Sequence, residues 1–129
     1  MRKTNLLRAL SILFFLSISN ISFAGGRYED PPDGLVEVYG LSQQILQALD
    51  AGDNAKALEI VKQARKIALD SYKEKSSMPM QIASSGMKEA RNALEANPAD
   101  VAKAKQEVQH AYEKLSSEIE YYKKEGKIK

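Results

Sequence analysis

Apolar residues recur at intervals of three and four along almost the whole chain after residue 34, and this periodicity most constrains its fold. Such spacing gathers apolar side chains on one face of an α-helix, and that face must be buried against another element. The chain contains no cysteine, so apolar burial rather than disulfide bonding must hold the fold together. About 100 residues suffice for one hydrophobic core. The sequence therefore predicts a single all-α domain.

The first two helical segments are expected at about residues 35–51 and 54–75. Gly52 can end the first helix, because glycine readily adopts the left-handed conformation that closes a helix. Asp53 or Asn54 can cap the second helix through a side-chain oxygen. The short connection predicts that these two helices form an antiparallel hairpin.

The third and fourth helical segments are separated by Asn97-Pro98. Pro79 suits a first helical position and opens the third segment, which we expect to reach about residue 97, with Gly86 weakening its middle. The fourth is the longest, beginning at Asn97-Pro98 with Asp100 in its first turn. The inward positions of these two segments are expected to be Met80, Ala83, Met87, Ala90, Leu94, Val101, Ala104, Val108, Ala111, Leu115 and Tyr122.

The two halves of the chain resemble each other. Ala48-Leu49-Asp50-Ala51 precedes the first hairpin turn much as Ala93-Leu94-Glu95-Ala96 precedes the second, whose turn is two residues longer. Two such hairpins with short loops predict an antiparallel up-down four-helix bundle over residues 35–125. The alternative is a pair of tetratricopeptide-like hairpins, but such repeats normally need at least about three copies to bury their faces.

The first 24 residues read as a secretory signal peptide, with Arg2, Lys3 and Arg8 before an apolar stretch and small residues before a cleavage site after Ala24. This stretch is short for a membrane span, which needs roughly 20 apolar residues. We therefore expect a periplasmic or secreted protein without a membrane span after cleavage. Cleavage removes three of the 19 basic residues and none of the 17 acidic ones. The resulting near-neutral chain gives no support to nucleic-acid binding.

A Pro/Gly leader at residues 25–34 and a basic tail at residues 126–129 flank the predicted bundle. The leader contains Pro31-Pro32 and three acids, and we expect it to be flexible and to end in a cap at Asp33. Lysines of the tail would lie in solvent near the negative end of the last helix.

The motif with most chemical interest is Glu107-Val108-Gln109-His110, in the last predicted helix. Residues three apart on a helix can hold one metal ion from the same face.

His110 is the only histidine, which leaves little for nucleophilic catalysis, so we expect no enzyme. No Cys-x-x-Cys-His motif is present, and the first helix offers no methionine to pair with His110, so no haem is expected. Met78, Met80 and Met87 could bind Cu(I) through their thioethers, although methionines on a helix face usually fill the core.

The turn-helix-turn organisation and the recurring Ala-x-x-Ala spacing resemble the small periplasmic metal-binding proteins, exported helical bundles with repeated His-Ala-x-Glu-Ala units. The resemblance covers about residues 41–115. The unit occurs once, as His110-Ala111-Tyr112-Glu113, while Gln63-Ala64-Arg65-Lys66 and Lys88-Glu89-Ala90 occupy comparable places without histidine. The resemblance implies weak binding of a divalent metal ion such as Cu, Ni or Zn, with His110, Glu113 and Glu107 as ligands.

A second hypothesis is a structural or interaction protein of the cell envelope that has lost metal binding. Tyr112, Tyr121 and Tyr122, with Ile119, extend beyond the expected end of the second helix. Amphipathic rings on an overhanging helix suit contact with an envelope protein or a second copy of the chain. The alternative is that these side chains cover the open end of the bundle.

Overall fold

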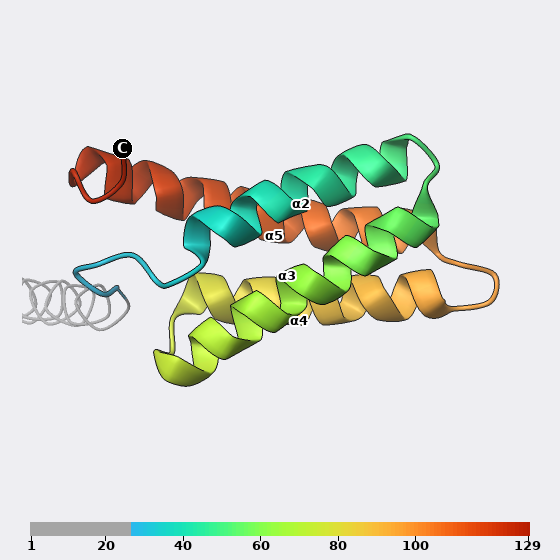
Figure 1. Ribbon diagram of the computed structural model, residues 1–129, viewed down its shortest axis with the longest axis horizontal. Helices are drawn as coiled ribbons and strands as arrows, with labels where there is room; N and C mark the ends of the chain where they lie inside the picture. The colour runs from blue at the N-terminus through green and yellow to red at the C-terminus, as the bar shows by residue number, and fades with distance from the viewer. Residues whose placement is uncertain (1–26) are drawn as a thin grey trace, which may run out of the picture.

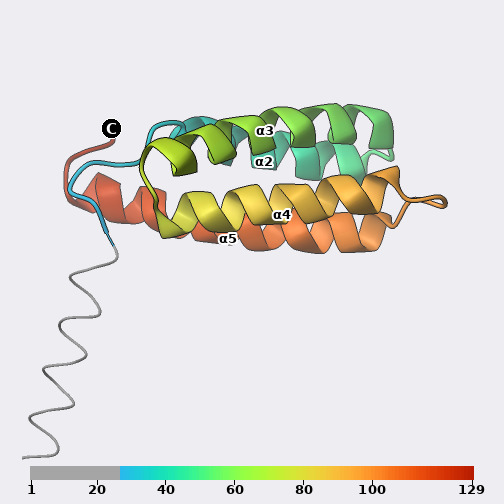
Figure 2. The same cartoon turned by 90° about the horizontal axis from the view of Figure 1, so that it is seen from below.

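The computed structural model describes residues 27–129 and shows four helices with no strand in that range (Figure 1). The helices are α2 (Leu35–Asp50), α3 (Asn54–Glu74), α4 (Met78–Glu95) and α5 (Val101–Lys124). Each packs against the next, and α2 also packs against α5, which closes the ring. The pair α2–α3 lies over the pair α4–α5 (Figure 2). The predicted all-α four-helix bundle of two hairpins is confirmed, whereas the predicted signal peptide lies outside the described residues.

The turn between α2 and α3 uses one aspartate for both helices. Gly52 has a φ of 77°, and its N–H donates a hydrogen bond to the Leu49 carbonyl at 3.1 Å. The Asp53 N–H donates a hydrogen bond to the Ala48 carbonyl at 2.9 Å, which completes a Schellman motif at the end of α2. The Asp53 carboxylate then accepts the Lys56 N–H at 3.1 Å and caps α3. The predicted roles of Gly52 and Asp53 are confirmed.

The turn between α4 and α5 is two residues longer, as the sequence indicates, but the expected start of the last helix is wrong. Asp100 is the N-cap, with φ −94° and ψ 81°, and its carboxylate accepts the Lys103 N–H at 3.0 Å. A capping residue must lie outside helical geometry to reach that N–H. Consequently α5 begins at Val101 rather than at Asn97-Pro98.

The expected cap at Asp33 is also wrong. Gly34 precedes α2 with a φ of 81°, and no side chain caps the helix. A Cβ atom built on Gly34 would lie 2.7 Å from Ile67 Cγ2 of α3. Both the left-handed backbone and the close approach to α3 therefore require glycine at this position.

The core is built mainly from small and branched aliphatic side chains along all four helices. Met80 and Met87 are fully buried, as expected of core filler, whereas Met78 is 56% exposed. Seven alanines have no exposed surface, which lets the helices approach closely: Ala57, Ala64, Ala68, Ala83, Ala90, Ala104 and Ala111.

Gly86 sets the approach of α4 to α5. A Cβ atom at this position would lie 3.2 Å from the Glu107 carbonyl oxygen and 3.5 Å from Ala111 Cβ. The sequence predicts only that Gly86 weakens α4, but the structure adds a packing role.

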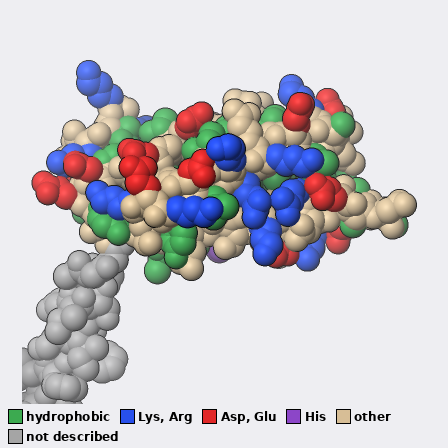
Figure 3. All heavy atoms as spheres, turned by 60° about the horizontal axis from the view of Figure 1, so that its bottom comes forward, with side chains coloured by type: hydrophobic (Ala, Val, Ile, Leu, Met, Phe, Trp, Pro, Cys, Tyr) green, Lys and Arg blue, Asp and Glu red, His purple; other side chains and the backbone are tan. Residues whose placement is uncertain are grey.

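On the face of the molecule in Figure 3, acidic and basic side chains are interspersed. Among the described residues, no helix is both long and apolar enough to cross a membrane.

Candidate functional site

A shallow groove of about 270 Å³ lies between α4 and α5, where Gly86 packs closely against α5. His110 and Glu107 line it from α5, because their three-residue spacing places them on the same side of the helix. His110 is exposed and Glu107 is partly buried. The full lining is Gln81, Ile82, Ser85, Gly86, Glu89, Glu107 and His110.

Glu113, the third predicted ligand, lies elsewhere. It lines a different groove on α5, and its carboxylate accepts the Gln109 Nε2–H at 3.3 Å. Glu113 also lies three residues from His110, a spacing that makes side chains neighbours on a helix, but it is not among the residues that line the His110 groove. The structure therefore brings together two of the three predicted residues.

Glu89 of α4 also lines the His110 groove. It also forms an ion pair with Lys103 at 3.8 Å. In the sequence, Lys88-Glu89-Ala90 occupies a comparable helical place without histidine, and Glu89 is not among the predicted ligands. Across residues 27–129, no three histidine or acidic side chains are arranged closely enough to hold a metal ion as a group.

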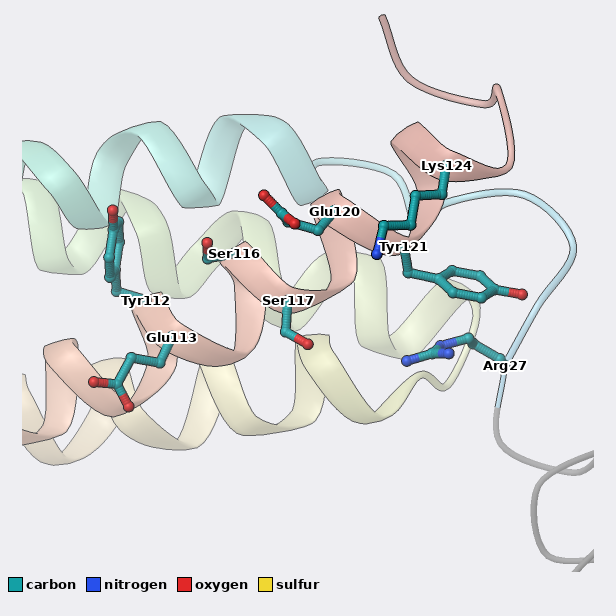
Figure 4. A pocket seen from close by; sticks show the side chains of 8 residues that line it. All are labelled: Arg27, Tyr112, Glu113, Ser116, Ser117, Glu120, Tyr121 and Lys124. Atoms are coloured by element: carbon teal, nitrogen blue, oxygen red, sulfur yellow. The ribbon is translucent and has the colours of Figure 1, made fainter.

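A larger groove of about 530 Å³ runs along the outer side of the last turns of α5 (Figure 4). At one end Tyr112 stacks on Tyr39 of α2, with ring centroids 5.2 Å apart and hydroxyl oxygens 3.4 Å apart. The hydrogen bond to Tyr112, together with burial, raises the pKa of Tyr39. The groove is lined by Arg27, Tyr112, Glu113, Ser116, Ser117, Glu120, Tyr121 and Lys124.

The other end of this groove, at Arg27, adjoins the buried carboxylate of Glu118, which is not among the predicted site residues. Glu118 is only 2% exposed, yet it lies in the apolar register of α5. Its carboxylate accepts hydrogen bonds from Arg27 Nε at 3.3 Å and from Arg27 Nη2 at 3.1 Å, and Lys114 Nζ lies 3.4 Å from Oε1. The hydrogen bond to Glu118 raises the pKa of Arg27. A charged residue three positions after the core residue Leu115 is the sequence signal that could have revealed a buried carboxylate, although not its partner.

The leader packs against the end of the bundle. The buried Tyr122 hydroxyl donates to the Tyr28 carbonyl at 2.9 Å, and burial raises the pKa of Tyr122. Lys127 pairs with Asp30 at 3.3 Å. Residues 27–34 form no helix, as expected, but they contact α5 and the tail.

The tyrosines in the second half of α5 differ in how far they are exposed to solvent. Tyr122 and Ile119 are buried. For these two residues, the alternative prediction that the side chains cover the end of the bundle is therefore confirmed. Tyr112 and Tyr121 are partly exposed and line the larger groove.

Comparisons of this chain with family models, curated proteins and solved structures find no match. The resemblance to the small periplasmic metal-binding proteins therefore stays a prediction.

Proposed function

We propose that this chain is an exported, non-enzymatic binding protein that binds a divalent metal ion weakly in the groove between α4 and α5. The observation that carries the proposal is the shared lining of that groove by His110 and Glu107 from α5 and by Glu89 from α4. A neutral imidazole nitrogen and carboxylate oxygens suit Cu(II), Ni(II) or Zn(II). Rotation of these exposed or partly buried side chains would be needed to bring the three donors onto one ion.

The location of Glu113 in a separate groove makes the proposal sharply testable. Calorimetric titration of residues 25–129 with each of the three metal ions should show His110→Ala weakening affinity by about tenfold or more. Glu89→Gln should weaken it less, because one carboxylate is lost and the imidazole stays. Glu113→Gln is the matched control, since it removes an equal charge from the same helix outside the groove. Equal losses in Glu89→Gln and Glu113→Gln would show that Glu89 has no special part in binding and would refute the groove between α4 and α5 as the site.

The second candidate is an interaction protein that meets an envelope protein or a second copy of itself. The specific observation in its favour is the larger groove on α5, with the partly exposed rings of Tyr112 and Tyr121. Aromatic rings with polar tips are enriched at protein interfaces. Sedimentation of the chain at several concentrations tests the self-association version, and a monomer mass that stays constant would remove it.

A further inference from the structure

The buried carboxylate of Glu118 makes the end of the bundle unusual. It lies among Leu115, Ile119 and Tyr122 of α5, all of which are buried. A carboxylate removed from water is strongly unfavourable unless a cation and hydrogen bonds compensate it. Within residues 27–129 its cationic partners are Arg27 and Lys114.

The contact with Arg27 has the geometry of guanidinium recognition. Nε and Nη2 each reach a different oxygen of Glu118, at 3.3 and 3.1 Å. A planar guanidinium can make such a two-point contact, whereas an ammonium acts as a point charge. The guanidinium carbon also lies 3.9 Å from the centroid of the Tyr121 ring, which adds a cation–π contact. Figure 4 shows Arg27 beside Tyr121 at the end of the groove.

Arg27 belongs to the leader and not to a helix of the bundle. Part of the leader is held by ion pairs from Lys127 to Glu29 and Asp30, whose side chains are 88% and 72% exposed. Such exposed pairs contribute little to stability. The leader is also held by the hydrogen bond from the Tyr122 hydroxyl to the Tyr28 carbonyl and by the Lys75 ammonium over the Tyr28 ring, so a competing segment must displace these contacts as well. Besides Arg27, the charged residues that line the groove are Glu113, Glu120 and Lys124, so two carboxylates outnumber one ammonium and favour a cationic segment.

We propose that Glu118 and Tyr121 form a binding site for an arginine side chain, which Arg27 fills from within the chain. When the leader is displaced, an arginine of a partner protein takes its place, with its neighbouring residues in the α5 groove. The leader thus acts as an internal competitor for this site. The arginine site is independent of the proposed metal site. It would be the means by which the interaction protein of the second candidate function recognises its partner.

The test is chemical rescue of Arg27→Ala in residues 25–129, with ethylguanidinium as the probe. Thermal unfolding followed by circular dichroism should show a saturable rise in Tm. At about ten times its dissociation constant, the probe should raise the folding equilibrium constant roughly 11-fold. Ethylammonium should raise it less, because it lacks the two-point contact. If Arg27→Ala is unfolded without the probe, ethylguanidinium is expected to restore its helical signal.

Two controls isolate the site. The double variant Arg27→Ala, Glu118→Gln should show no rescue, because the charged acceptor is gone. Lys62→Ala removes the cation of the exposed pair with Glu95, 3.6 Å apart, and should not respond to the probe. No saturable response in Arg27→Ala, or equal responses in it and the double variant, would overturn the inference. Such a failure would leave the metal titration and the sedimentation measurement unaffected, so it is distinguishable from failure of either proposed function.

Discussion

Replacing Arg27 with alanine should destabilise the bundle although Arg27 lies outside its helices. The variant loses two charge-assisted hydrogen bonds to the buried Glu118 carboxylate. Breaking a fully buried ion pair costs about 3–5 kcal/mol. The Arg27 side chain is 38% exposed and Lys114 stays beside Glu118, so we discount this to about 1–2 kcal/mol. For a domain of this size, that loss lowers Tm by about 4–16 °C.

A double-mutant cycle with Glu118→Gln, measured by urea unfolding of residues 25–129, checks this reasoning. We expect a coupling energy of about 1 kcal/mol between Arg27 and Glu118, because they are in direct contact. Lys62→Ala is the matched control, since its pair with Glu95 is exposed and should change stability by less than about 0.5 kcal/mol. A coupling energy near zero, or an Arg27→Ala effect no larger than that of Lys62→Ala, would refute the account of the buried pair.

Three further predictions follow from the packing and the caps. Gly86→Ala gains about 1 kcal/mol of helix propensity, but its Cβ would lie 3.2 Å from the Glu107 carbonyl. Because that backbone must shift, at a cost of about 1–3 kcal/mol, urea unfolding should show no net gain in stability, and a clear gain would contradict the close approach. Asp53→Ala and Asp100→Ala should each cost about 1 kcal/mol in the same assay, because both carboxylates cap helices; a loss at only one position would show that the two caps are not equivalent. Burial raises the pKa of Tyr122 above the ordinary value of about 10 for a tyrosine, so its contribution to stability is present below about pH 10 and is lost as the pH rises through the folded-state pKa. Alkaline unfolding followed by tyrosinate absorbance should therefore be less steep in Tyr122→Phe, and an unchanged profile would exclude this role.

Much of the fold could be predicted because local signals agree with the global arrangement. Gly52 and Asp53 form the first turn as predicted, since a glycine C-cap followed by an N-cap aspartate is encoded within a few residues. The apolar period predicts the core positions of α4 and α5, including Met87 and Leu115. The start of α5 at Val101 is displaced by a few residues because Asp100 caps that helix instead of entering it.

The candidate sites could be predicted only in part, because they depend on contacts between distant segments. The shared side of His110 and Glu107 follows from helical spacing, but their approach to Glu89 depends on how α4 packs against α5. The Arg27–Glu118 pair joins residues 91 positions apart, and no local pattern specifies such a contact. Glu118 in an apolar register indicates that a cation must be near, without indicating which one.

The proposed metal site is tested most directly by adding substoichiometric Cu(II) to isotope-labelled residues 25–129 and recording amide NMR spectra. Paramagnetic broadening should begin in the two segments that contribute residues to the His110 groove, 81–89 of α4 and 107–110 of α5. Broadening should disappear from both segments in His110→Ala and remain in Glu113→Gln. Broadening centred on Glu113, or spread evenly over exposed carboxylates, would contradict the proposed site.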